Sequence, residues 1–428
     1  GFHLASEKAR EEVDNIAEAV DPDDDELLRK VAETSMTGKG AELEKDVLAD
    51  LVVRAVQQVT VEADDGSHIV DLENVKIETQ TGRSAGESDL LVGAVINKNA
   101  VHDDMPTDFE NADTLLLNEA IEIEEADVDT QVSIETPDQL QKFLDKEEAQ
   151  LKQKVDQIVE SGADVVFCQK GIDDLAQHYL AKEGILAIRR TKKSDIKFLK
   201  NVLGGSVVSD TDSLTASDLG KGSVRRDEDD ELFYVEGTGD EVHGVTLLLR
   251  GSTDHVVDEL ERGINDAIDV VSTTVSDGRV LAGGGAPEVE LARRLRDYAD
   301  SVSGREQLAV EAFADSLELV PRVLAENAGL DSIDLLVDLR AEHEGGDTHA
   351  GLNAFSGNVE DTFEAGIVEP AHAKEQALSS ATEAANLVLK IDDIIAAGDL
   401  STSGGDEEGG APGGMGGMGG MGGMGGAM

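Results

Sequence analysis

The sequence predicts a multidomain protein in which mostly helical regions surround an α/β domain. The first observation is the length, because 428 residues exceed what one hydrophobic core usually organises. The second is the order of the patterns, which are helical at both ends, mixed further inside, and alternating between strand and helix at the centre. The third is the near symmetry of that order. An insertion of one domain within another explains this symmetry better than a row of separate domains.

Helical patterns occupy the first fifty residues. One helical stripe is formed by Ala5, Ala9, Val13, Ile16 and Val20. Breaks are predicted at the segments DPDDD and TGKG, which are residues 21–25 and 37–40. Residues 68–98 then turn to strand, because β-branched residues are frequent in HIVDLENVKIET and LLVGAVI.

From about residue 112 the chain alternates between strand and helix, which predicts the α/β domain. Strands are expected in the segments TLLLNEAIEIE, DVVFC and ILAIRR. The long helix after the first of them has Thr136 as its N-cap, Pro137 at its first position, and Gln139 to complete a capping box. From residue 254 to 397 the chain is again mostly helical.

The charge is strongly negative, since 36 Lys and Arg residues stand against 91 Asp and Glu residues and give a net charge of −55. This balance excludes nucleic acid as a partner, because phosphate binding needs a basic surface. The acidic residues are spread over the whole chain, and their mutual repulsion is screened only in concentrated salt. With 3% aromatic residues and no Trp, this predicts a cytoplasmic protein of a halophile rather than an ordinary acidic protein.

Three further features of the sequence restrict which class of protein it can encode. The only cysteine, Cys168, excludes an intrachain disulfide, and its apolar surroundings indicate a buried inert thiol rather than a nucleophile. The longest apolar run, LLVGAVI, is too short to span a membrane. The tail at 399–428 is a low-complexity Gly–Met segment, which predicts disorder.

The segment VLAGGGAPEVELARRL, residues 280–295, predicts a strand, a glycine turn and a helix. Gly283, Gly284 and Gly285 form the turn. Glycines at such a turn let the backbone approach a phosphate at the helix N-terminus. They are equally consistent with a tight turn that holds no ligand.

Other chemical motifs are weaker. Lys39 lies between two glycines in MTGKGAE, but no Ser or Thr follows it, so this is no Walker A motif and a plain turn is the simpler interpretation. No zinc-binding pattern and no nucleophile elbow occurs. Asp266 lies roughly opposite the apolar stripe of the helix at 254–271, where a solvated face is the simplest interpretation.

Three long stretches together resemble the archaeal group II chaperonins, or thermosomes: VFCQKGIDDLAQHYLAKEGILAIRR at 166–190, SGREQLAVEAFADSLELVPRVLAENAGLD at 303–331, and the segment from AGLNAFSG to KIDDIIAA at 350–397. The resemblance covers nearly the whole chain and implies a subunit of a double-ring ATPase that encloses unfolded protein. It implies chaperonin architecture, with a mostly helical equatorial domain, a mixed intermediate domain and an inserted α/β apical domain. The implied boundaries are 1–28 (equatorial, partial), 29–96 (intermediate), 97–250 (apical), 251–282 (intermediate), 283–398 (equatorial) and 399–428 (tail).

The resemblance also implies a nucleotide site. AGGGAPEVE is similar to the chaperonin nucleotide loop, so Gly283, Gly284 and Gly285 would lie against ATP. Asn353 in AGLNAFSG resembles the residue that lines the adenine pocket. Glu369 in GIVEP resembles the acidic residue that accepts hydrogen bonds from the ribose hydroxyls.

Two further roles follow from the same resemblance. Asp266 resembles the aspartate that orients the attacking water when the subunit closes, although the family usually has Glu where Asn265 stands. Lys39 resembles the lysine of the loop that senses the nucleotide. The family holds the phosphates and Mg²⁺ with a GDGTT segment that includes a metal-binding Asp. Nothing here matches that segment, so we expect the chain to begin after it and to lack part of the ATP site. The ATPase activity is then expected of the full-length parent, and this chain alone is expected to be inactive.

Residues 124–153 occupy the place of the helical protrusion that closes the lid of group II chaperonins. Leu140, Phe143 and Leu144 lie near its tip and are interpreted either as core or as a patch that contacts clients or the lid. The partners implied are unfolded proteins and other subunits of a homo- or hetero-oligomeric ring, with no nucleic acid and no membrane. The main alternative is a holdase that captures apolar segments through the apical domain without ATP. A small-molecule α/β enzyme would need a catalytic constellation that the sequence does not show.

Overall fold

The computed structural model describes residues 1–37, 44–123, 137–238 and 244–390, with only the backbone of residues 137–140 and 142–144. The chain divides into one unit of Gly1–Glu383 and another that begins at Ala384. Among the described residues of the first unit, the buried side chains gather into three large hydrophobic cores and two small ones.

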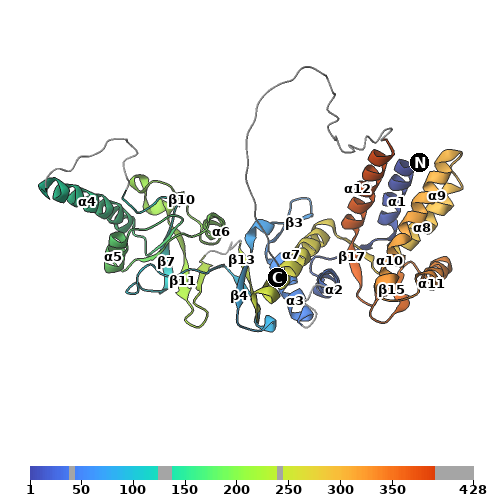
Figure 1. Ribbon diagram of the computed structural model, residues 1–428, viewed down its shortest axis with the longest axis horizontal. Helices are drawn as coiled ribbons and strands as arrows, with labels where there is room; N and C mark the ends of the chain where they lie inside the picture. The colour runs from blue at the N-terminus through green and yellow to red at the C-terminus, as the bar shows by residue number, and fades with distance from the viewer. Residues whose placement is uncertain (38–43, 124–136, 239–243, 391–428) are drawn as a thin grey trace, which may run out of the picture. The chain divides into compact units, whose positions relative to one another are not determined.

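One core joins the two ends of the first unit. Its helices are α1 (Phe2–Ile16), α8 (Ala286–Ala299), α9 (Arg305–Leu317) and α12 (Ala371–Leu389). The helices α10 (Leu319–Asn327) and α11 (Ser332–Gly345) pack with α8 in a smaller core. Ala9 and Val13 of α1 pack in the same core as Leu295 of α8 and Val310 of α9. Figure 1 shows α1, in blue, beside α8 and α9, in yellow and orange. Helices from opposite ends of the sequence therefore share one interior.

Short strands connect these helices. They are β1 (Glu18–Ala19), β14 (Arg279–Ala282), β15 (Ala350–Asn353), β16 (Asn358–Asp361) and β17 (Val368–Pro370). β14 lies between β1 and β17 and pairs antiparallel with both. β15 and β16 form an antiparallel hairpin. The stripe of α1 was expected to reach Val20, but the helix ends at Ile16, because the chain leaves it to pair with β14 and the Val20 N–H donates to the Gly278 carbonyl.

A second core contains three helices, a three-stranded sheet and a two-stranded sheet. The helices are α2 (Asp25–Met36), α3 (Lys45–Gln58) and α7 (Asp254–Asp277), and the strands are β2 (Thr60–Glu62), β3 (His68–Val70), β4 (Val75–Thr81), β5 (Asp89–Val92) and β13 (Val245–Gly251). β13 pairs parallel with β4 and antiparallel with β5. Its interior includes Leu28 of α2, Val52 of α3, Leu247 of β13 and Ile264 of α7.

The third core surrounds a seven-stranded sheet in the middle of the chain. Its strands are β6 (Ala94–Ile96), β7 (Asp108–Leu117), β8 (Val165–Cys168), β9 (Leu186–Ile188), β10 (Val207–Val208), β11 (Gly220–Arg226) and β12 (Phe233–Gly237), and its helices are α4 (Pro137–Ser161), α5 (Asp174–Lys182) and α6 (Lys193–Leu203). Strands β7, β8, β9 and β10 are parallel neighbours, whereas β6, β12 and β11 extend the sheet antiparallel. In the part of the chain that the structure describes, short 3-10 helices lie at Leu72–Asn74, Ala85–Glu87, Thr211–Ser213 and Ala216–Asp218.

The predicted α and α/β fold class is confirmed by this arrangement. Cys168 is fully buried, and that burial raises the pKa of its thiol to about 11, so the thiol stays protonated and unreactive at neutral pH. The strand expected through residue 124 was too long, because β7 ends at Leu117 and only an isolated bridge forms at Ile121. The N-cap assigned to Thr136 lies outside the described residues. No helix in the described ranges is long and apolar enough to cross a membrane.

Candidate functional site

The glycine turn at 283–285 joins β14 to α8, as the sequence predicted. Gly284 and Gly285 have φ angles of +65° and +84°, a region that strongly favours glycine. A Cβ on Gly284 would lie 2.4 Å from the Leu352 carbonyl oxygen, and a Cβ on Gly285 would lie 2.7 Å from Cβ of Pro321. Glycine is therefore required here by contacts within the protein itself.

Hydrogen bonds hold this turn between two other segments. The Gly283 N–H donates to the Ile367 carbonyl over 2.7 Å, just before β17. The Leu352 N–H of β15 donates to the Gly284 carbonyl over 2.8 Å. The Thr362 hydroxyl donates to the Gly283 carbonyl over 3.0 Å. The turn is therefore fixed by the β15–β16 hairpin on one side and by the entry to β17 on the other.

Asn353 follows Leu352 at the end of β15. Its side-chain amide donates to Oε1 of Glu360 over 2.6 Å, and its side-chain carbonyl accepts from the backbone N–H of Phe355 over 3.0 Å. Glu369 lies in β17, directly opposite Leu281 of β14 in the register of the sheet. The structure therefore brings the glycine turn, Asn353 and Glu369 into one neighbourhood, although the sequence separates Gly283 from Glu369 by 86 positions.

A lysine and a second carboxylate accompany Glu369. Lys374 Nζ lies 3.1 Å from Glu369 Oε1 and also pairs with Glu288, in the first turn of α8. The side chains of Glu288 and Lys374 are 4% and 15% exposed. Sequence reasoning missed both residues. Glu288 lies three residues after Gly285, and Lys374 lies five residues after Glu369. This closeness in sequence to predicted site residues was the only signal that could have indicated them.

The surroundings of Glu369 raise the pKa of its carboxyl group above the ordinary value. Burial raises the pKa of Glu369, Lys374 lowers it in part, Glu288 raises it further, and the result is about 7. Burial disfavours the charged form of Lys374, but its two carboxylate neighbours outweigh burial and raise the pKa of the ammonium group. The cluster therefore combines a permanent cation with a carboxyl group that titrates near neutrality.

Asp266 is not among the residues that the structure gathers at the turn. It is half-buried on α7, eleven residues before Asp277 at the end of that helix. At about 1.5 Å per residue, this places it roughly 16 Å along the helix from the end that leads into β14. Other predicted site residues lie outside the description: Lys39 altogether, and Leu140, Phe143 and Leu144 in their side chains.

The described residues hold no group of three or more His, Cys, Asp and Glu side chains arranged to bind a metal ion. The glycine turn precedes a helix whose N-terminus has no side-chain cap. Such an N-terminus attracts anions, because its backbone N–H groups carry partial positive charge. The arrangement is chemically suited to an anionic ligand that also has hydroxyl groups for Glu369.

Comparison with known proteins places the chain in a family. Residues 1–399 match the model of the TCP-1/cpn60 chaperonin family. The chain is 80% identical over 416 residues to thermosome subunit 2 of Haloferax volcanii, covering 97% of this chain and 75% of that relative. It is 72% identical over 407 residues to thermosome subunit beta of Halobacterium salinarum, covering 95% of this chain and 73% of that relative.

A solved structure supports the same assignment. It is the open state monomer of a group II chaperonin from Methanococcoides burtonii, with a TM-score of 0.71 and 43% sequence identity, and the match covers 91% of this chain and 92% of that one. The family resemblance and the chaperonin fold predicted from the sequence are thereby confirmed. The chain belongs to the TCP-1/cpn60 chaperonin family, as an archaeal group II chaperonin of the haloarchaeal type.

Proposed function

We propose that this chain is an ATPase subunit of a double-ring chaperonin that encloses unfolded protein under a built-in lid. The observation that carries the proposal is the position of Asn353 and Glu369, which are linked to the glycine turn through β15 and β17. These are the residues that the resemblance assigns to the adenine, the ribose and the phosphates of ATP. Family membership supports the same conclusion independently.

The parts of ATP match the chemistry of the site. The phosphates would lie at the turn of Gly283, Gly284 and Gly285, against the N-terminus of α8. Ionised Glu369 would accept hydrogen bonds from the ribose hydroxyls, and Asn353 would line the adenine pocket. Mg²⁺ would enter with the phosphates, since protein-bound Mg²⁺ commonly keeps phosphate oxygens and waters as ligands.

Asp266 is the proposed catalytic residue, because a carboxylate is suited to orient the attacking water in phosphoryl transfer. The structural neighbour is described as an open state, and Asp266 lies well away from the turn along α7. Hydrolysis would then require closure that carries α7 towards the nucleotide. Gly278, which ends α7 with a φ of +71°, is the natural position for this change of direction. Lys39 is proposed to sense the nucleotide.

The remaining assignments extend from the same proposal. The domain boundaries are those implied by the resemblance, with the apical domain at 97–250 and its protrusion at about 124–153. Leu140, Phe143 and Leu144 would contact clients or the lid. The subunit would act in the cytoplasm with unfolded proteins and with further subunits, of one or more kinds, in the ring.

Nucleotide binding and hydrolysis by the wild-type subunit in concentrated KCl, with any residues that precede Gly1 included, test this proposal. Glu369→Gln should weaken ADP binding, because an uncharged amide accepts more weakly from the ribose hydroxyls. Glu364→Gln, an exposed glutamate between β16 and β17, is the matched control and should bind as wild type does. Absence of ADP binding in the wild-type subunit would overturn the ATPase assignment. Suppression of client aggregation without nucleotide binding would identify a holdase.

A further inference from the structure

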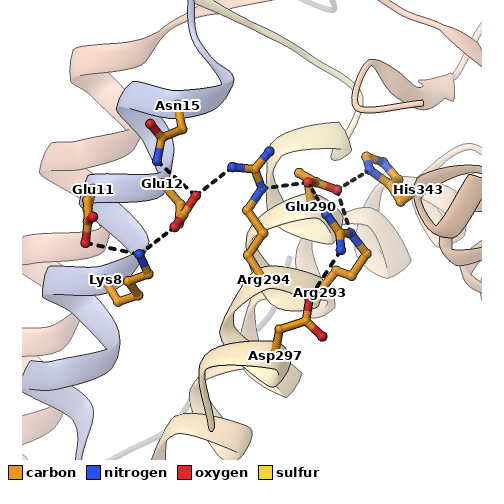
Figure 2. Close-up of polar contacts among 9 residues, drawn as sticks. All are labelled: Lys8, Glu11, Glu12, Asn15, Glu290, Arg293, Arg294, Asp297 and His343. Atoms are coloured by element: carbon orange, nitrogen blue, oxygen red, sulfur yellow. Dashed lines mark hydrogen bonds and ion pairs between the residues drawn. The ribbon is translucent and has the colours of Figure 1, made fainter. Parts of the chain in front are cut away.

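A network of charged side chains with a buried centre crosses the helical bundle from α1 to α11 (Figure 2). At its centre Glu290 of α8 is 0% exposed. Arg293 Nη2 donates to Glu290 Oε1 over 2.7 Å, and Arg294 Nε donates to the same oxygen over 2.6 Å. Arg294 also donates to Oε2 of Glu12 in α1, over 2.6 Å. The network thus has an α1 end at Glu12 and a second end where Glu290 meets α11.

At the α11 end Glu290 contacts His343, whose side chain is also 0% exposed. Nδ1 of His343 lies 3.1 Å from Glu290 Oε2, and Nε2 lies 2.9 Å from the Ala350 carbonyl oxygen. The Nδ1 contact thus connects α11 to α8, and the Nε2 contact connects α11 to the first residue of β15.

Glu290 is held in the charged form that this arrangement needs. Burial alone would raise the pKa of its carboxyl group. The hydrogen bonds from His343, Arg293 and Arg294 outweigh burial and hold the pKa well below its usual range. The carboxylate therefore stays ionised although it is buried, because these three neighbours satisfy it with hydrogen bonds.

This connection lies beside the glycine turn. The two residues after Ala350 both contact the turn: a Cβ on Gly351 would lie 2.5 Å from the Gly283 carbonyl oxygen, and the Leu352 N–H donates to Gly284. Glu290 belongs to α8, whose N-terminus the turn forms. The pair thus joins the strand on one side of the turn to the helix on the other.

We propose that Glu290 and His343 are a positioning pair that fixes β15 against the glycine turn and thereby sets the nucleotide affinity of the site. The ligand in this statement rests on the proposed function, whereas the effect on the turn rests on the contacts alone. Neither residue touches the turn directly. The pair acts through the Ala350 carbonyl and through α8.

The test compares the two ends of one network. His343→Leu removes both contacts of the ring, and Glu12→Gln, the matched control, weakens the network at α1 without touching β15. His343→Gln retains a donor for the Ala350 carbonyl and serves as the conservative variant. Two quantities are measured in concentrated KCl: hydrogen exchange of the Leu352 amide, with Val166 as the reference amide, and the dissociation constant for ADP with Mg²⁺.

We expect His343→Leu to speed exchange at Leu352 relative to Val166 and to weaken ADP binding about tenfold, the effect of losing one charge-assisted hydrogen bond. His343→Gln should retain most of the affinity. Glu12→Gln should lower the unfolding temperature and leave both quantities as in wild type.

Three results would count against the pair or the ligand. If His343→Leu leaves Leu352 exchange and ADP affinity unchanged, the positioning role is wrong. If Glu12→Gln weakens ADP binding as much as His343→Leu, the network only stabilises the bundle and the positioning role is again wrong. If wild type binds no ADP, the proposed function is wrong, and exchange at Leu352 alone then decides whether the pair fixes the turn.

Discussion

Arg296 of α8 forms a bidentate ion pair with Glu318: Nη1 donates to Oε1 over 2.8 Å and Nη2 donates to Oε2 over 2.7 Å. Arg340 of α11 binds the same carboxylate. The side chain of Glu318 is 5% exposed. Burial raises the pKa of Glu318, but the two arginines outweigh burial and lower it to about 2. One carboxylate therefore joins α8 and α11 at the start of α10.

The first prediction is acid sensitivity of the helical bundle. Because the pKa of Glu318 is lower in the folded state, its contribution is complete above pH 4.5 and is lost as the pH falls towards 2, on the order of 3 kcal/mol. Thermal unfolding at constant KCl should show a falling midpoint over this window. Glu318→Gln should be less stable near neutrality and should show a flatter pH dependence. Exposed Glu342→Gln on α11 is the control, and equal slopes in both variants would contradict the prediction.

The second prediction concerns Asp266. Asp266→Asn should leave nucleotide binding nearly intact and slow hydrolysis at least about a hundredfold, because orientation of the water acts mainly in the transition state. Phosphate release and ADP affinity are measured on the same preparation. Asp269→Asn, an exposed change one turn further along α7, should hydrolyse as wild type does. Normal turnover in Asp266→Asn would remove this residue from the catalytic role.

The third prediction is a pH dependence of nucleotide affinity. The pKa of Glu369 is about 7, so its carboxylate fraction increases between pH 6 and 8, and ADP binding should strengthen over that range. Lys374 lowers this pKa, so Lys374→Met should shift the midpoint to higher pH, whereas Lys374→Arg keeps the charge and should shift it less. Calorimetric titrations of ADP across this range check the prediction. An affinity that is independent of pH in wild type would refute the role of Glu369.

The fourth prediction concerns salt. With a net charge of −55, the fold should weaken below about 1 M KCl, where the screening length grows and like charges repel over longer distances. Circular dichroism across a KCl titration measures the loss of helix. Sucrose at matched viscosity, which does not screen charge, serves as the control. Full helicity at low salt would contradict the halophile interpretation.

The fifth prediction concerns the protrusion. Replacing residues 124–153 with a short glycine–serine linker should leave ATP hydrolysis largely present and abolish enclosure of a client, because closure of the lid would need this segment. Protease protection of an unfolded client in the assembled ring, with and without ATP, measures enclosure. A shortened ring that still protects its client would show that this segment is not the lid.

Local features of the sequence predicted local structure well. The strand, turn and helix around Gly284 were predictable, because an apolar run, three glycines and Pro287 follow one another directly. The partners of that turn were not predictable, because Leu352 and Ile367 reach it only through long-range pairing of short strands. β1 shows why, since its two residues are both exposed and carry no periodic signal.

The buried charges were also beyond sequence patterns. Glutamate is rarely fully buried, so a helix position such as Glu290 is normally assigned to a solvated face. It is buried here because Arg293, Arg294 and His343 satisfy it, and the last of these lies more than fifty residues away. The family resemblance supplied the roles of Asn353 and Glu369, which the spacing of residues alone could not indicate.

The way the helical bundle is built has a consequence for synthesis of the chain. Val13 of α1 shares its core with Leu378 of α12, whereas the core of the seven-stranded sheet is drawn only from residues between Ala94 and Val235. Domains generally fold as units as they leave the ribosome. The central sheet can therefore fold before α8, α9 and α12, which pack against α1, have been translated. Closing a loop of that size is slow, since long-range contacts must form before they contribute stability. A chaperonin subunit built in this way therefore keeps the part of the apolar face of α1 that packs against α8, α9 and α12 uncovered until late in its own synthesis.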